Sequence, residues 1–303
     1  MKLTAVIDMG SNSFILLIGE KDNVIEEVVC EVGLKGINSR SKAVELGRKA
    51  LQNMVRRARD AECSVYVFGT ALFREDPDLF YQITVGLNVN SAILTQEEEA
   101  MYSYLSVDDS LSCSKMTVID LGGGSLEVVT SKGFKGFQLG THILNSLFDL
   151  SLPGARDFDK AVTHTKNVLC KSVRKDSFLV GIGGSFVAIA AFFLEKWDLR
   201  AVDGFLLRKK HVDTVISTLR EMSYEKLRSL KFLPKGRERT LAAGCVVARV
   251  LTDLCGEIKI SSKGYRYAVL KDITSNGKLT YPWRARGDLN SRPPDPQSSA
   301  LSS

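Results

Sequence analysis

The chain has 303 residues, of which 44% are hydrophobic and 25% are charged, so we expect a globular protein of about two domains with sizeable cores. Its formal net charge of +6 is modest and is not gathered in one long basic run, which gives no indication of nucleic-acid binding but suits a small polyanion. The six cysteines are far apart and only three histidines accompany them, which argues against a zinc site or a disulfide framework and favours a reduced, cytoplasmic protein.

The first half of the sequence predicts a mixture of strands and helices. Residues 3–8 and 14–20 are expected to be strands joined by a turn at 10–13, and Asp8 excludes the first apolar run as the core of a signal peptide. The elements expected after them are a strand at 24–32, a helix at 41–62, a strand at 63–71, a turn or helix start at 72–78, and a strand leading into a helix at 91–105.

The second half begins with the same order of elements. We predict a strand at 115–120, a turn at 122–125 and a returning strand at 126–130. The later elements are segments with helical spacing at 156–173, 209–222 and 239–255, and a strand at 256–270.

Two further segments are judged by composition. Residues 178–194 carry no charge, but 17 residues is the short limit for crossing a bilayer and a Gly-Gly-Ser sequence interrupts the run. We therefore predict a buried strand, a turn and a buried helix there instead of a membrane span. Residues 275–303 have little apolar content and a Pro-rich stretch, so we predict a disordered tail that cannot offset its ordering entropy by burial.

One pattern occurs twice in the chain. The sequence "VIDMGSNSFILL" at 6–17 returns as "VIDLGGGSLEVV" at 118–129, and the two aspartates, Asp8 and Asp120, are 112 positions apart. A strand-end aspartate followed by a Gly- or Ser-rich turn places a carboxylate beside backbone N–H groups that can surround a phosphate. A plain tight turn would explain one copy, whereas two copies predict two hairpins that grip a phosphate from both sides.

Other phosphate-binding signatures are missing from the sequence. Neither copy of the pattern contains G-x-G-x-x-G, and "GIGGSF" at 181–186 lacks the third small residue, which argues against a Rossmann dinucleotide site. No glycine loop is followed by G-K-[ST], so a Walker-type NTPase is not expected either.

A reacting group is best sought in "LTQEEEAMYSYL" at 94–105. With Thr95 as N-cap, Glu98 reaches back in a capping box and Glu99 remains for chemistry, although acidic residues are also common in any first helical turn. Arg74 follows a strand and has the forked geometry that holds phosphate oxygens, although a lone arginine is more often a solvated surface residue. The basic groups at 208–211 and 235–239 are either solvated faces or a guide for an anionic chain.

Several motifs together resemble one known family. In order and spacing, the chain is similar to the exopolyphosphatase / guanosine pentaphosphate phosphohydrolase (Ppx/GppA) family over residues 3–271. The motifs that carry this resemblance are "AVIDMGSNSFILLI", "GTALFRE", "ILTQEEEAMYSYLSV", "TVIDLGGGSLEVV", "FQLGTHIL", "LVGIGGSFVAIAA" and "VDGFLL".

The resemblance implies an α/β fold with two ribonuclease H-like domains of the actin, sugar-kinase and heat-shock-chaperone ATPase superfamily, flanking a central cleft. We expect an N-terminal domain at 1–113, a C-terminal domain at 114–274 and the tail at 275–303. The implied enzyme is a Mg²⁺-dependent hydrolase that removes the terminal phosphate of inorganic polyphosphate or of guanosine pentaphosphate.

The resemblance also assigns roles by position. Glu99 is the implied catalytic base that deprotonates the attacking water, and Mg²⁺ would be held near Asp120, Glu127 and Asp8. The implied phosphate-binding residues are Asp8, Gly10, Ser11, Asn12, Ser13, Arg74, Gly122, Gly123, Gly124, Ser125, Gly183, Gly184 and Ser185.

The chain departs from the family pattern at several positions. Ile15 and Met101 stand where members often have arginine, which predicts weaker affinity for a polyanion or a different phosphate compound.

Several functions are compatible with these observations, and the first hypothesis is a short exopolyphosphatase. The alternatives are a guanosine pentaphosphate 5′-phosphohydrolase, a non-catalytic phosphate or nucleotide sensor, and, more weakly, a kinase of the same superfamily. Among partners we expect no nucleic acid and no membrane, and the family's habit of dimerising makes a homodimer an expectation.

Overall fold

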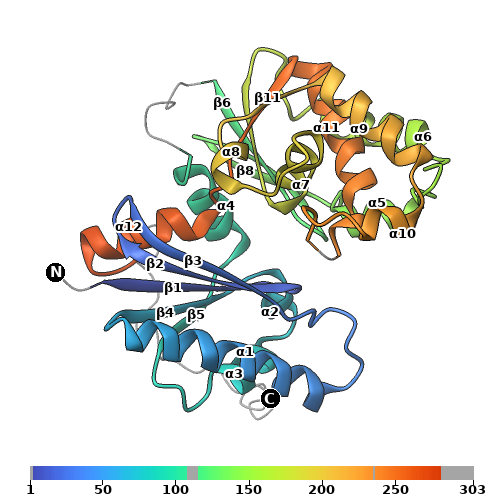
Figure 1. The fold of residues 1–303 in the computed structure, drawn as a ribbon. Coiled ribbons are helices and arrows are strands. Elements are labelled where there is room, and N and C mark those ends of the chain that lie inside the picture. The colour runs from blue at the N-terminus through green and yellow to red at the C-terminus, as the bar shows by residue number, and fades with distance from the viewer. Residues whose placement is uncertain (1–2, 108–114, 235, 281–303) are drawn as a thin grey trace, which may run out of the picture. The chain divides into compact units, whose positions relative to one another are not determined.

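The computed structural model describes residues 3–107, 115–234 and 236–280. The chain divides into two compact units, and each combines one sheet with helices (Figure 1). Unit 1 comprises Met1–Glu99 and Arg266–Ser303, and unit 2 comprises Ala100–Tyr265.

The sheet of unit 1 has the strand order β3-β2-β1-β4-β5. Its strands are β1 (Thr4–Met9), β2 (Ser13–Glu20), β3 (Asn23–Glu31), β4 (Ser64–Gly69) and β5 (Asn90–Ile93). The first three strands pair antiparallel, and β1, β4 and β5 pair parallel. The helices of this part are α1 (Arg40–Asp60), α2 (Ala71–Glu75), α3 (Pro77–Thr84), the start of α4 (Gln96–Leu105), and α12 (Tyr265–Asn276).

Helices cover both faces of this sheet. In Figure 1, α1 and α3 lie on one face and α12 lies on the other. Helix α1 begins at the N-cap Ser39, whose hydroxyl accepts a hydrogen bond from the N–H of Lys42. A Cβ atom on Gly47 would come within 2.6 Å of the Ile83 side chain, so the close packing of α1 on α3 requires glycine at that position.

The sheet of unit 2 has the strand order β10-β11-β9-β6-β7-β8. Its strands are β6 (Met116–Leu121), β7 (Leu126–Thr130), β8 (Gly133–Phe137), β9 (Phe178–Ile182), β10 (Leu206–Arg208) and β11 (Glu257–Ile260). Its helices are α5 (Thr141–Leu147), α6 (Phe158–Leu169), α7 (Gly184–Phe193), α8 (Leu199–Val202), α9 (Lys209–Glu221), α10 (Tyr224–Arg228) and α11 (Leu241–Cys255), with a 3₁₀ helix at Arg237–Arg239.

These strand orders confirm the predicted fold class. In chain order, the sheet of unit 1 runs third, second, first, fourth and fifth strand, which is the ribonuclease H-like order. The sheet of unit 2 has the same order when β10, which lies at one edge, is left out of the count. Residues 178–194 form a buried strand followed by a buried helix, as predicted, with β9 leading into α7. In the part of the chain that the structure describes, no helix is both long and apolar enough to cross a membrane.

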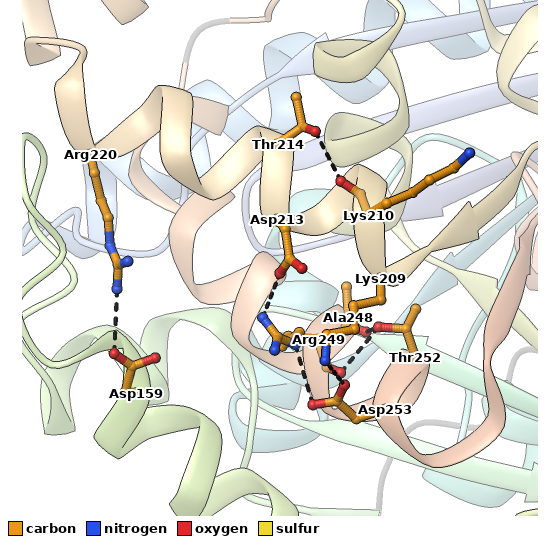
Figure 2. A network of polar contacts seen from close by, with 10 residues as sticks. All are labelled: Asp159, Lys209, Lys210, Asp213, Thr214, Arg220, Ala248, Arg249, Thr252 and Asp253. Carbon is orange, nitrogen blue, oxygen red and sulfur yellow. Dashed lines mark hydrogen bonds and ion pairs between the residues drawn. The ribbon is translucent and has the colours of Figure 1, made fainter.

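Helix α11 is the centre of the helical layer in unit 2, where it contacts α6, α7 and α9. At its outer side Arg249 pairs with Asp213 on α9 and with Asp253 one turn further along α11, and Lys209 lies 3.1 Å from Asp253 (Figure 2). Because these side chains are between about a quarter and a half exposed, each pair adds little stability alone. Together they fix how α9 lies on α11.

Three predicted boundaries were wrong. The expected division at residues 113 and 114 lies outside the described residues, and the units divide earlier, after Glu99. The chain returns to unit 1 at Arg266, so the second domain does not extend to residue 274. The strand predicted at 256–270 ends at Ile260, and residues from Tyr265 form α12. The first residues of the predicted tail, Ser275 and Asn276, end that helix, and residues 281–303 lie outside the described part.

A buried ion pair explains why α12 belongs to unit 1. Arg266 donates to Glu27 of β3 through Nε at 3.1 Å and also through Nη2, and the Tyr267 hydroxyl donates to the other oxygen of Glu27 at 2.7 Å. The side chains of Arg266 and Glu27 are only 10% and 15% exposed. Because neighbouring residues of a strand face opposite sides, Glu26 instead pairs with Arg57 of α1 on the other face.

This difference between neighbouring glutamates gives a stability prediction. Glu27→Gln leaves Arg266 buried without its counter-charge, so we expect the free energy of unfolding to fall by about 3 kcal/mol in urea titrations followed by circular dichroism. Glu26→Gln is the matched control and should have a much smaller effect, because its pair is exposed to solvent. Equal losses in the two variants would show that α12 does not depend on the buried pair.

Candidate phosphate and metal site

The two copies of the repeated sequence form hairpin loops with the same hydrogen bond. In unit 1 the N–H of Gly10 donates to the carbonyl of Ser13 at 3.0 Å. In unit 2 the N–H of Gly122 donates to the carbonyl of Ser125, also at 3.0 Å. The sequence repeat is therefore a structural repeat down to a single backbone contact.

The loop of unit 1 turns its carbonyl groups toward the segment that follows β3. The carbonyl of Asn12 accepts from the N–H groups of Val32 and Gly33, each at 2.8 Å, and that of Ser11 accepts from Lys35 at 3.1 Å. Among the described residues, the N–H groups of Ser11 and Asn12 have no backbone acceptor. Consecutive N–H groups of this kind form an anion-binding nest.

The loop of unit 2 turns its carbonyl groups toward the start of helix α5. The carbonyls of Gly122 and Gly123 accept from the N–H groups of Thr141 and His142 at 3.1 and 2.8 Å. A Cβ atom on Gly140, the residue before α5, would collide with the backbone of Gly123, so glycine is required for this approach. Within the described part of the chain, no backbone group accepts from Gly123 N–H or from its neighbour at 124.

Strand pairing places two carboxylates side by side in unit 2. Asp120 of β6 is directly opposite Glu127 of β7, whereas Asp8 of β1 is directly opposite Ile15 of β2. Side chains of directly opposite residues lie on the same face of the sheet, with Cβ atoms about 5 Å apart. Unit 2 therefore offers two carboxylates in this pair and unit 1 offers one.

This carboxylate pair fits a magnesium ion. Mg²⁺ prefers oxygen ligands and is usually held by one or two carboxylates together with waters and substrate phosphates. Asp120 and Glu127 supply those two carboxylates, and both are partly exposed at the end of the sheet. In the described residues, no group of three or more His, Cys, Asp or Glu side chains is close enough to hold a metal. Asp8 as a third ligand stays a prediction.

The third glycine motif lies against the same aspartate. Gly183 precedes α7 with a φ of +99°, a conformation that favours glycine. A Cβ atom there would be 2.7 Å from the Leu121 carbonyl and 3.4 Å from Oδ1 of Asp120. The guanidinium of Arg237 lies over Gly184, and Ser185 is buried. Unit 2 thus brings together most of the residues that were predicted for it.

In unit 1, Glu99 has a specific partner. Nη1 of Arg74 is 2.6 Å from Oε2 of Glu99 and also donates to the carbonyl of Leu94 at 3.0 Å. The side chains of Arg74 and Glu99 are each about one quarter exposed, so water still reaches the pair. Arg74 is therefore not the solvated surface arginine that was the alternative at the sequence level. Its predicted phosphate contact stays a prediction.

The predicted capping box at the start of α4 is present. Oε2 of Glu98 accepts from the N–H and the hydroxyl of Thr95 at 2.8 and 2.9 Å, and the N–H of Glu98 is 3.2 Å from the Thr95 hydroxyl. Glu98 is only 3% exposed. The capping residue and the candidate base are therefore neighbours with separate partners.

Arg266 also acts on the first loop through its charge. Burial alone would lower the pKa of Arg266, but the carboxylates of Glu27 and Asp8, together with the hydrogen bond to Glu27, raise that pKa above its ordinary value. Arg266 therefore stays charged and offsets the negative charge of Asp8.

Sequence reasoning missed three residues around the carboxylates. Ser103 donates to Asp120, Arg237 covers Gly184, and Arg266 acts on Asp8. Arg237 belongs to the basic group at 235–239, but neither its position in the sequence nor that of the other two indicates these contacts.

Comparison with known proteins gives a family and a fold. Residues 6–275 match the sequence model of the Ppx/GppA phosphatase family. A curated relative from Vibrio campbellii, named guanosine-5'-triphosphate,3'-diphosphate pyrophosphatase, is 30% identical over 188 residues, which are 55% of this chain and 38% of that protein. A relative of the same name from Vibrio vulnificus is 29% identical over 218 residues, covering 63% of this chain and 44% of its own. The matches thus span less than half the length of these relatives.

Solved structures share the fold at lower identity. The Ppx/GppA family member of Aquifex aeolicus has a TM-score of 0.77 at 22% identity, covering 92% of this chain and 99% of its own. An exopolyphosphatase from Cytophaga hutchinsonii has a TM-score of 0.77 at 18% identity, covering 91% of this chain and 99% of its own.

The capping box gives a prediction about α4. Glu98→Ala removes a buried carboxylate that satisfies Thr95, and we expect the free energy of unfolding to fall by about 2 kcal/mol. Glu97→Ala is the control, because Glu97 is in the same helical turn but is exposed. Urea unfolding followed by circular dichroism gives both values. A loss as large for Glu97→Ala would contradict a specific role of the cap.

Proposed function

Because the chain belongs to the Ppx/GppA phosphatase family, we propose that it hydrolyses the terminal phosphoanhydride bond of inorganic polyphosphate, with Glu99 as general base and Mg²⁺ as cofactor. The observation that carries the proposal is the hairpin of unit 2, where Asp120 and Glu127 stand opposite each other beside a loop with two open N–H groups. A substrate made of phosphate and a bound metal ion needs carboxylates to hold the cation and N–H groups to hold the phosphate oxygens.

Phosphate oxygens would bind to the loops in this proposal. The N–H groups of Gly123 and Gly124 in unit 2, and of Ser11 and Asn12 in unit 1, have no backbone acceptor within the described residues. Such preorganised donors need no rearrangement when negative charge develops on the transferring phosphoryl group. The loops would therefore stabilise the transition state as well as bind the substrate.

The metal would add a second source of charge stabilisation. Asp120 and Glu127 would hold Mg²⁺, which neutralises charge on phosphate oxygens when it is bound. Two carboxylates leave coordination positions for waters and for the substrate's phosphate.

Glu99 would activate the attacking water. The water oxygen forms a bond to the terminal phosphorus, the bond to the bridging oxygen breaks, and the carboxylate of Glu99 takes a proton from the water. Arg74 holds Oε2 of Glu99 and is itself fixed by the carbonyl of Leu94, so it is a positioning residue for the base. The products are orthophosphate and a chain shorter by one phosphate.

A second candidate substrate is guanosine pentaphosphate. The name shared by the curated relatives favours it, since it describes hydrolysis of a guanosine 5′-triphosphate that carries a 3′-diphosphate. The reaction at the terminal phosphorus would be the same. The difference would lie in residues that hold the nucleoside.

The role of Glu99 gives the third prediction. Glu99→Ala should lower phosphate release by at least ~10²-fold, because the general base is lost. The measurement is phosphate release from long-chain polyphosphate, tripolyphosphate and guanosine pentaphosphate, with Mg²⁺ and with EDTA. Glu97→Ala, which removes an exposed carboxylate two residues away, should retain wild-type turnover.

The outcomes separate the candidate functions. Faster turnover of polyphosphate supports the first substrate and faster turnover of guanosine pentaphosphate supports the second. Full activity of Glu99→Ala would exclude Glu99 as the base. If the wild type turns over none of these substrates, the enzymatic function is contradicted and a sensor of phosphate compounds is favoured.

A further inference from the structure

Helix α4 makes a polar contact with Asp120 that the proposed reaction does not explain. The hydroxyl of Ser103 donates a hydrogen bond to Oδ2 of Asp120 at 2.9 Å, and Ser103 is fully buried. Both residues belong to unit 2. A buried hydroxyl bound to one of the two candidate metal ligands is therefore part of the surroundings of the site.

The hydroxyl of Ser103 differs from those of several other helical residues in the described part of the chain. Those of Thr84, Thr252 and Thr274 donate to the carbonyl four residues earlier in their own helices, at 2.9, 2.9 and 2.7 Å. That of Ser106, the residue after α4, donates to the carbonyl of Ser103 at 2.7 Å. Such local bonds are the usual choice of a hydroxyl within a helix. Ser103 instead binds a carboxylate 17 positions away in the sequence.

We propose that Ser103 is a positioning residue that holds the carboxylate of Asp120 in the orientation needed to bind the cation. One carboxylate oxygen, Oδ2, is fixed by the hydroxyl, and the other, Oδ1, faces the tight approach of Gly183. Carboxylates that bind metals are commonly held by such hydrogen bonds, and removal of the partner weakens metal binding. The inference rests on the proposed function, because that proposal makes Asp120 a metal ligand.

The surrounding packing prevents Ser103 from moving away. Ala100 of α4 and Val107, two residues after the helix ends, pack with Val118, Val129 and Val180 of the sheet in one hydrophobic cluster. This cluster fixes α4 on the face of the sheet where Asp120 and Glu127 lie. Ser103 lies four residues after Glu99, so the helix that carries the candidate base also carries the group that holds the metal ligand.

The test measures cation binding directly. Mn²⁺ shares the preference of Mg²⁺ for oxygen ligands and its free ion gives a signal in electron paramagnetic resonance, so titration of the full chain yields a dissociation constant. We expect Ser103→Ala to weaken Mn²⁺ binding by about 10- to 100-fold. At saturating Mg²⁺ the kcat for phosphate release should recover toward the wild-type value, while the Mg²⁺ concentration for half-maximal rate rises.

Three comparisons separate positioning from packing. Ser106→Ala removes a buried hydroxyl just after the same helix, which donates to the Ser103 carbonyl and not to Asp120, and it should keep Mn²⁺ affinity within about twofold of the wild type. Ser103→Thr keeps a hydroxyl and should restore most of the affinity. If Ser103→Ala does not fold, Ser103→Cys keeps the size of the side chain with a weaker donor and should still bind Mn²⁺ less tightly.

The results distinguish this inference from the proposed function. Wild-type Mn²⁺ affinity in Ser103→Ala, or equal losses in Ser103→Ala and Ser106→Ala, would overturn the role of Ser103 while leaving hydrolysis intact. A wild type that binds no Mn²⁺ would also overturn it. A wild type that binds Mn²⁺ but releases no phosphate would contradict the proposed function, and weaker binding by Ser103→Ala would then still support the inference.

Discussion

The register of the β6–β7 hairpin is the constraint on which the site depends. Asp120 and Glu127 share a face because they are directly opposite each other, and a slip of one residue would send one of them to the other face. The turn bond from Gly122 to Ser125 and the apolar cluster beneath α4 hold this register. The carboxylate pair is thus a consequence of strand pairing and needs no special loop conformation.

The strand-end aspartates of the two units have different partner side chains. In each, the strand-end aspartate interacts with a helical residue of its own unit: Arg266 of α12 acts on Asp8 in unit 1, and Ser103 of α4 binds Asp120 in unit 2. The arginine offsets the charge of a carboxylate that faces Ile15, whereas the serine orients a carboxylate that faces Glu127. Metal binding is accordingly proposed for the second hairpin, whereas in the first hairpin the charge of the aspartate is offset by an arginine.

Local signals in the sequence were sufficient for much of the fold. The repeated hairpins, the capping box of Thr95 and Glu98 and the β9–α7 segment were all predictable, because turn chemistry, capping and burial act over a few residues. The return of α12 to unit 1 was not, because it depends on Arg266 meeting Glu27, which is 239 positions earlier in the chain. Ser103 was unpredictable for the same reason: only the folded chain shows which acceptor its hydroxyl chooses.

The central claim is that the second hairpin holds a cation between its two carboxylates. Crystals of the chain grown with Mn²⁺ and inorganic phosphate, measured at the manganese absorption edge, locate the ion directly. The account predicts an anomalous peak about 2.1 Å from an oxygen of Asp120 and from an oxygen of Glu127, with phosphate on the N–H groups of Gly123 and Gly124. A Mn²⁺ ion that is bound by neither carboxylate would contradict it.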